Sequence, residues 1–145
     1  MIPLVIISPI DRDLILEGSF TRRRFIDGVI GQTDKTYLKN LVDYNKTLAQ
    51  RNALLKYFAI NRTFDSTNLE IYNQQMIDLS QPIHDKRKAF IEAFIPIFMH
   101  RYNIISNSQE CVTINYYSDL NEKGMDELLS LNFQRDKSLQ YTSVG

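Results

Sequence analysis

Residues 34–60 read DKTYLKNLVDYNKTLAQRNALLKYFAI, and this stretch decides the fold. Its apolar residues recur at spacings of three, four and seven, which is the pattern of a helix with one buried face. Thr33 or Asp34 can cap the first turn, so we predict a long helix that opens there and runs to about Ile60. The apolar stripe consists of Tyr37, Leu41, Tyr44, Leu48, Leu55 and Phe58.

Arg51 occupies the one step that is missing from this stripe, between Gln50 and Asn52. Hydrophobic burial would favour Leu or Ile there, because a buried guanidinium is costly unless it is paired and hydrogen-bonded. One hypothesis is a polar network that fixes the register of two packed helices. The other is a contact to another domain or to a DNA backbone.

A second long helix is predicted to start at Asp65 or Ser66, and its apolar positions continue to Phe98. Pro82 should kink this helix, or end it and begin another, and Pro96 is a second irregularity. A short turn at residues 62–64 would then join two long helices into an antiparallel hairpin. Its apolar face contains Leu69, Tyr72, Met76, Leu79, Ile83, Phe90, Phe94, Ile97 and Phe98.

The ends of the chain have shorter patterns. Residues 2–7 are predicted to form a buried strand and residues 11–16 a short helix. Ser19 would cap a further helix that reaches Ile30 and stops at Gly31. Alternation over residues 112–117 predicts a half-buried strand, followed by a helix over 125–131 and a closing strand over 139–144. The predicted fold class is α+β and predominantly α, with residues 1–145 as a single domain.

The composition is that of an ordinary globular domain, with 17 basic and 17 acidic residues among 145. No apolar run approaches the length of a membrane span, so no membrane partner is expected. The single cysteine, Cys111, excludes an internal disulfide and is typical of a reducing cytoplasm. Balanced charge argues against a whole-surface nucleic-acid binder, although residues 33–62 carry six basic and two acidic groups.

The sequence contains none of the usual catalytic or metal-binding motifs. There is no Gly-rich phosphate loop, no nucleophile motif and no Cys/His cluster at metal-ligand spacing. His84 and His100 lie 16 residues apart without a partner at helical spacing, and Cys111 is better interpreted as a small core residue. No catalytic residue and no metal ligand is therefore predicted. Catalysis by Cys111 or by a histidine is a hypothesis that ranks below a binding role.

Arg22, Arg23 and Arg24 place three permanently charged guanidiniums on one helical turn. They fan over about 300° around the helix axis, so at least one must point toward the protein body. That arginine would pair with Asp27 or a neighbouring acidic helix, or the group would contact phosphates or an acidic partner.

The polar segments resemble the RecF family. The resemblance is carried by RRRFID at residues 22–27 and QRNALLK at residues 50–56, against RRRFLD and QRNALLK in that family. It extends to Arg135-Asp136 and to YTSVG at residues 141–145, where Gln140 replaces the family's Gly before Tyr-Thr. The strong motifs cover residues 8–56 and 135–145.

The resemblance implies a fragment of an ABC-type ATPase related to the heads of SMC and Rad50 proteins. The family's Walker A loop precedes the matching segment and its signature and Walker B motifs follow it, so this chain alone would not be an enzyme. It would be the helical lid or arm, with residues 1–8 and 108–145 as its edges toward the ATPase head. The terminal strands would join the sheets of that head. The full-length protein would be a weak DNA-dependent ATPase that uses ATP and Mg.

The resemblance also implies partners. Such a protein forms an ATP-dependent homodimer on single-/double-strand DNA junctions and, with RecO and RecR, promotes RecA loading in DNA repair, recombination, replication restart and the SOS response. It would be cytoplasmic. The alternative is a helical protein–protein interaction module with no nucleic-acid role. The candidates for DNA or partner contacts are Arg22, Arg23, Arg24, Gln50, Arg51, Asn52 and Lys56.

Overall fold

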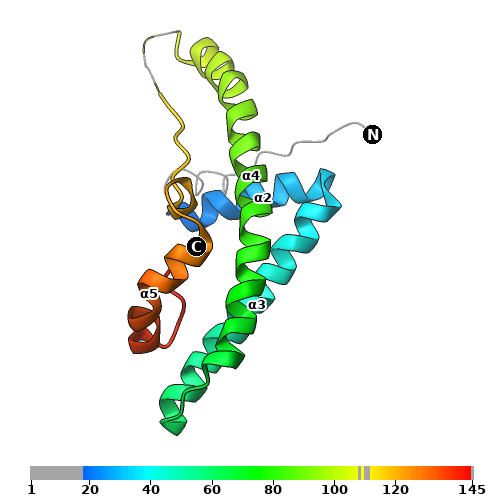
Figure 1. The fold of residues 1–145 in the computed structure, drawn as a ribbon. Coiled ribbons are helices and arrows are strands. Elements are labelled where there is room, and N and C mark those ends of the chain that lie inside the picture. The colour runs from blue at the N-terminus through cyan, green and yellow to red at the C-terminus, as the bar shows by residue number, and fades with distance from the viewer. Residues whose placement is uncertain (1–17, 108, 110–111, 145) are drawn as a thin grey trace.

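The computed structural model describes residues 18–107, 109 and 112–144, which are predominantly helical (Figure 1). The prediction of a predominantly α fold is therefore confirmed. In chain order the described elements are α2 (Ser19–Thr33), α3 (Lys35–Asn61), α4 (Ser66–Ile105), the short 3-10 helix η2 (Asp119–Asn121) and α5 (Met125–Leu139).

The two long helices, α3 and α4, begin where their capping residues predict. The Asp34 carboxylate accepts a hydrogen bond from the Tyr37 amide at 2.9 Å, and the Asp65 carboxylate accepts one from the Asn68 amide at 3.1 Å. Each bond satisfies an amide that a helix start leaves without a partner. α3 ends at Asn61, and the left-handed φ of 51° at the following residue, Arg62, turns the chain toward α4.

α3 and α4 lie side by side and run in opposite directions (Figure 1). Thr47 bonds Gln75 at 3.3 Å, and Arg51, one turn later on α3, bonds Asn73 at 2.8 Å. Residue numbers therefore rise along one helix as they fall along the other.

α4 is one continuous helix through both of its prolines, so of the two alternatives predicted at Pro82, a kink or an end, the end is excluded. A proline removes one backbone hydrogen bond and crowds one carbonyl, which packed neighbouring turns can absorb. Ile83 and Ile91 are both buried within this stretch. Figure 1 shows the result as a single helix that curves along its length.

The boundaries predicted for the first described helix are wrong at both ends. Gly18, not Ser19, occupies the capping position, and α2 passes through Gly31 to Thr33. Gly31 lies inside the helix and close to α3, since a Cβ on Gly31 would lie 3.4 Å from the Leu38 side chain.

The predicted strands over 112–117 and 139–144 are wrong, since the described residues there form no strand. The alternation is nevertheless real, because Val112, Ile114 and Tyr116 are half-buried while the residues between them are exposed. A strand needs a neighbouring backbone to pair with, and the described part of the chain offers none. Residues 139–144 fail because α5 continues to Leu139 and Gln140 then adopts a left-handed φ of 61°.

Other predictions fall outside the described residues. These are the strand over 2–7, the helix over 11–16 and the setting of Cys111.

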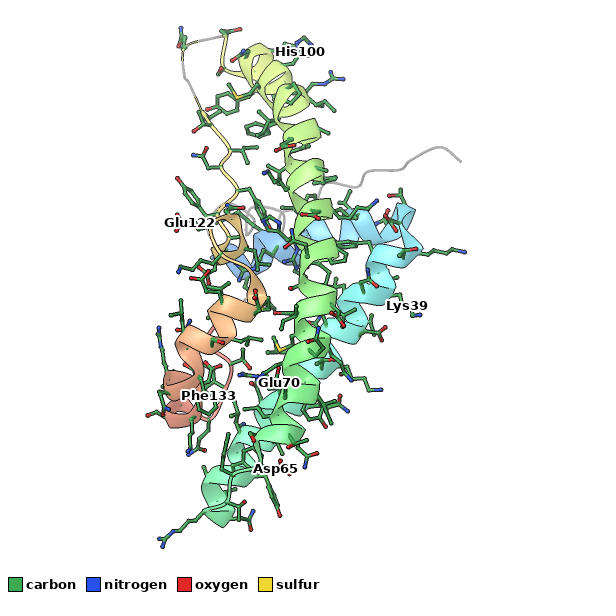
Figure 2. All side chains as sticks on the ribbon, viewed as in Figure 1. Lys39, Asp65, Glu70, His100, Glu122 and Phe133 are labelled. Atoms are coloured by element: carbon green, nitrogen blue, oxygen red, sulfur yellow. The ribbon has the colours of Figure 1, made fainter. Side chains whose placement is uncertain are left out.

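Three apolar clusters join the helices. Figure 2 shows the end of α4 near His100 projecting away from the other helices. One cluster holds α2 against α3 and α4, a second lies near the turn between α3 and α4, and a third docks α5 on α4. Their buried members are Ile30, Tyr37 and Ile83 in the first, Leu55, Phe58 and Leu69 in the second, and Met76, Met125 and Leu129 in the third.

Candidate functional site

The three consecutive arginines, Arg22, Arg23 and Arg24, lie on the second turn of α2, and all three are exposed. Neither Arg23 nor Arg24 forms a hydrogen bond or an ion pair within the described part of the chain. The first turn of α2 contains no acidic residue to balance the positive end of the helix dipole. This end of α2 is therefore an exposed, strongly basic surface.

Asp27 pairs with Arg87 of α4, a residue that sequence reasoning missed. Arg87 donates from Nε and from an Nη to the two Asp27 carboxylate oxygens, both at 2.8 Å. The Tyr37 hydroxyl of α3 donates to the same carboxylate at 2.5 Å. This triad ties α2, α3 and α4 together, and no sequence pattern marks Arg87 among the other charges of α4.

Burial and the neighbouring Asp27 carboxylate raise the pKa of Tyr37 above its ordinary value near 10. A tyrosine whose pKa is raised on folding stabilises the fold fully below the unfolded pKa. That contribution declines as the pH rises above 10, because the unfolded tyrosine then ionises more readily than the folded one.

We expect the Tyr37→Phe variant to be less stable than the natural protein at pH 8, by about 1.5–3 kcal/mol for one hydrogen bond to a charged group. The difference in the free energy of unfolding should narrow between pH 10 and 11. In this range the natural protein loses the stabilisation that Tyr37 provides, and the variant has none to lose. Urea unfolding of both proteins at pH 8 and pH 11 measures this difference. A gap that stays constant or widens with pH would contradict the buried Tyr37–Asp27 bond.

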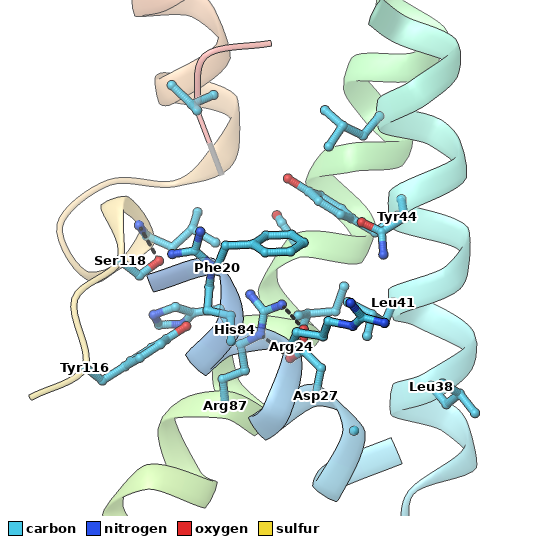
Figure 3. Close-up of a pocket in the computed structure, with 18 residues that line it drawn as sticks. Phe20, Arg24, Asp27, Leu38, Leu41, Tyr44, His84, Arg87, Tyr116 and Ser118 are labelled. Atoms are coloured by element: carbon cyan, nitrogen blue, oxygen red, sulfur yellow. Dashed lines mark hydrogen bonds and ion pairs between the residues drawn. The ribbon is translucent and has the colours of Figure 1, made fainter. Parts of the chain in front are cut away.

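A pocket of about 630 Å³ lies between α2, α3, α4 and the segment that precedes α5. Asp27 and Arg87 line it, so its charged lining includes a neutralised ion pair. In Figure 3, Arg24 extends from α2 toward the side of α3 that carries Leu41 and Tyr44. The other polar or aromatic groups that line the pocket include Phe20, Arg23, Tyr44, His84, Tyr116 and Ser118.

Arg51 is fully buried, with no exposed surface. One Nη donates to the Asp136 carboxylate of α5 at 2.8 Å and to the Thr142 hydroxyl at 2.7 Å, while Nε donates to the Asn73 amide oxygen of α4 at 2.8 Å. Its second Nη is buried without a hydrogen-bond partner among the described residues. Arg51 therefore belongs to a polar network, which was one of the two hypotheses for it. The network joins α3, α4, α5 and the segment after α5.

Asn52 and Asp136 extend this network along the segment that follows α5. The Asn52 side-chain oxygen accepts from the Thr142 amide at 2.7 Å and from the Thr142 hydroxyl at 2.8 Å. Asp136 accepts from the Ser143 amide at 2.8 Å and from the Ser143 hydroxyl at 2.7 Å. Residues 50–56 and residues 135–143, far apart in sequence, thus form one bonded unit.

Gln50 and Lys56 differ from Arg51, because both are exposed on α3. Together with the three arginines of α2 they remain accessible to a partner. Arg51 presents no surface to one. Asp136 and Thr142 carry the network and were not predicted as site residues, although the Arg135-Asp136 and Tyr141-Thr142 pairs were already visible in the sequence.

No metal site is formed by the residues that the structure describes, since no three or more His, Cys, Asp or Glu side chains cluster there. His84 is buried and bonds the Asn121 side chain at 2.9 Å, and His100 is exposed near the free end of α4. None of the described helices combines the length and the apolar character that crossing a membrane requires.

Comparisons with known proteins agree with this arrangement. No family model matches the chain. The chain is 55% identical over 144 residues to the DNA replication and repair protein RecF of Flavobacterium johnsoniae, and 43% identical over 145 residues to that of Parabacteroides distasonis. These matches cover 99% and 100% of the chain, which spans about 40% of the length of these relatives.

Two solved structures share the fold. They are structures of the recombination mediator protein RecF in the RecFOR pathway, described as RecF-ATP and RecF-ATPrS. The first superposes with a TM-score of 0.82 at 28% identity, and the second with 0.87 at 30% identity. Each match covers 97% of this chain and 40% of the other chain.

Proposed function

This chain belongs to the RecF family over the whole length that it shares with these relatives, and from that premise we propose that it is the helical lid or arm of a DNA repair and replication ATPase. In this role it contributes contacts to DNA, to a second copy or to a protein partner. It carries no catalysis of its own. The full-length protein would supply the sites for ATP and Mg, and the support for ATP is that two similar structures are described as RecF-ATP and RecF-ATPrS.

The observation that carries the DNA role is the exposed basic end of α2. Arg22, Arg23 and Arg24 share one turn, and Asp27, the acidic residue nearest to them in sequence, is engaged by Arg87. Guanidiniums in this setting bind phosphate oxygens and fix a protein on a nucleic acid without reading its sequence. The lid would therefore contribute backbone contacts at single-/double-strand junctions.

Residues 112–117, which form no strand within the described chain, have a place in the same proposal. Residues 112–117 alternate between half-buried and exposed positions, which is the burial of a strand whose pairing partner lies elsewhere. They would pair with the ATPase head in the full-length protein. The whole protein would dimerise with ATP, and with RecO and RecR it would load RecA at gaps in the cytoplasm.

One observation favours the alternative, a helical protein-interaction module without a nucleic-acid role. The free end of α4 exposes three isoleucines with 59–81% of their surface accessible. Exposed aliphatic side chains gathered at one end of a helix are typical of a protein contact. They are Ile97, Ile104 and Ile105.

Replacing Arg22, Arg23 and Arg24 together by alanine tests the DNA role in the full-length protein. Each phosphate contact that is lost should lower the slope of log affinity against log salt by about 0.9 on duplex DNA, so the slope should fall by up to about 3. Fluorescence anisotropy with a labelled junction DNA, between 50 and 200 mM salt, measures this slope.

A matched triple variant removes the same charge elsewhere. Lys88, Arg101 and Arg135 are exposed on α4 and α5, and their replacement by alanine should leave the slope near its natural value. An unchanged slope in the α2 variant rejects the phosphate role. Equal losses in both variants would show a general charge effect instead of a site on α2.

A further inference from the structure

The pocket beside α2 combines free positive charge with accessible aromatic surface. Its volume of about 630 Å³ lies within the range of small-molecule sites, about 300–1,000 Å³. Phe20, Arg23 and Arg24 of α2 contribute to its wall, and because all three are exposed we call this part of the wall its mouth. The pocket is distinct from the buried Arg51 network, because neither Arg51 nor Asp136 lines it.

The charge at the mouth of the pocket is unbalanced. Arg23 and Arg24 have no ionic partner within the described residues, whereas the carboxylate that also lines the pocket, that of Asp27, is neutralised by two bonds from Arg87. The N-terminal end of α2 adds the positive end of its dipole, and its capping residue, Gly18, supplies no side-chain acceptor. An anionic group would therefore be favoured at this mouth.

The aromatic surface has the character of a stacking platform. Phe20 leaves 70% of its surface accessible although it lines the pocket. Figure 3 shows its ring reaching across the space toward Tyr44 of α3. On the opposite side the rings of His84 and Tyr116 lie with centroids 5.7 Å apart and planes inclined by 38°. A flat group entering the pocket would meet ring faces and the Arg24 guanidinium.

A flat aromatic group joined to a phosphate describes a nucleotide. We propose that this pocket receives one unstacked nucleotide of single-stranded DNA, with its base against Phe20 and its phosphate on Arg23 and Arg24. Stacking on an aromatic ring and a guanidinium accepts any base, because every base has a π face. The bases of a duplex are already stacked and cannot enter, so the pocket distinguishes single strands from duplexes.

This proposal rests on the proposed DNA role of α2 and adds a location and a specificity to it. The lid would hold the single-stranded side of a junction. Further contacts of α2 to phosphates would be made on the single-stranded or the duplex side. An acidic peptide would satisfy the two arginines, but it would make no particular use of the exposed Phe20 ring. The nucleotide uses both features.

The test replaces Phe20 by leucine in the full-length protein, with circular dichroism to verify folding. Fluorescence anisotropy measures binding to a labelled 12-nucleotide oligo-dT strand and to a blunt 20-base-pair duplex. We expect single-strand affinity to fall about tenfold, the value of one base–aromatic stack, while duplex affinity stays within twofold. Phe20→Tyr keeps the ring and should restore binding. Phe25→Leu removes an exposed ring of the same helix that does not line this pocket, and it should change neither affinity.

Each other outcome overturns the pocket. If Phe20→Leu leaves oligo-dT binding unchanged while the triple arginine variant loses DNA binding, the DNA role of α2 stands and the nucleotide pocket fails. Equal losses on single strand and duplex would show that Phe20 acts through the position of α2. If Phe20→Leu weakens only an acidic, phenylalanine-containing peptide, the pocket belongs to a protein partner. If none of the variants weakens DNA binding, the proposed function and the pocket are rejected together.

Discussion

Replacing Asp136 by alanine is expected to lower the free energy of unfolding by about 3–5 kcal/mol. The substitution leaves the Arg51 guanidinium fully buried without its carboxylate, and an uncompensated buried charge is among the most costly defects in a fold. It also removes the acceptor of the Ser143 amide and hydroxyl. Since the total free energy of unfolding of a domain is about 5–15 kcal/mol, the loss should appear as a large shift in the urea midpoint.

Two controls identify the cause. The double variant Arg51→Met/Asp136→Ala should be destabilised by much less than the sum of the two single variants, because each single change already destroys the same pair. Glu127→Ala removes an exposed carboxylate of the same helix, which pairs with Lys123, and should cost less than about 1 kcal/mol. Strict additivity in the double variant would show that Arg51 and Asp136 do not stabilise each other.

Replacing Met76 by alanine is expected to lower the free energy of unfolding by about 2–5 kcal/mol. Met76 of α4 has no exposed surface and packs against Met125 and Leu129 of α5. The truncation removes buried apolar surface and leaves a cavity between the two helices, because the surrounding structure closes it only in part. Urea unfolding followed by circular dichroism measures the loss.

The matched variant for Met76 is Met76→Leu, which keeps the volume and should cost less than about 1.5 kcal/mol. Ile71→Ala truncates an exposed residue of the same helix and should stay within about 0.5 kcal/mol of the natural protein. If Met76→Ala were no more harmful than Ile71→Ala, the docking of α5 on α4 would contribute little to the fold.

The pairing of residues 50–56 with residues 135–143 changes how these motifs are interpreted. Arg51 and Asn52 contact Asp136 and Thr142 instead of a ligand, so the buried part of the QRN motif builds the arm. Gln50 and Lys56 are exposed, and their contact to a partner stays a prediction. Of the predicted contact residues, the three arginines of α2 with Gln50 and Lys56 of α3 are exposed, and Arg51 is not.

The starts of α3 and α4 were predictable because each depends on a capping side chain within one turn. Asp34 and Asp65 each bond an amide three residues away, and that spacing is visible in the sequence. The helix stop predicted at Gly31 was wrong, and of the two alternatives at Pro82 the helix end is excluded. A glycine or a proline is a local signal, and it does not include the packing of neighbouring helices. The strand predicted over residues 112–117 failed for a related reason, because a strand depends on a second backbone that the sequence pattern does not include.

The sequence by itself determined the helical class, the caps of α3 and α4, the family resemblance and the anomaly at Arg51. These are properties of periodicity, spacing and residue type within short segments. Only the tertiary structure decided the partner of each charge. Arg51 met Asp136 across 85 residues, and Asp27 met Arg87 across 60. A buried ion pair depends on which side chains the packed helices bring within about 3 Å, and that distance follows from the whole fold.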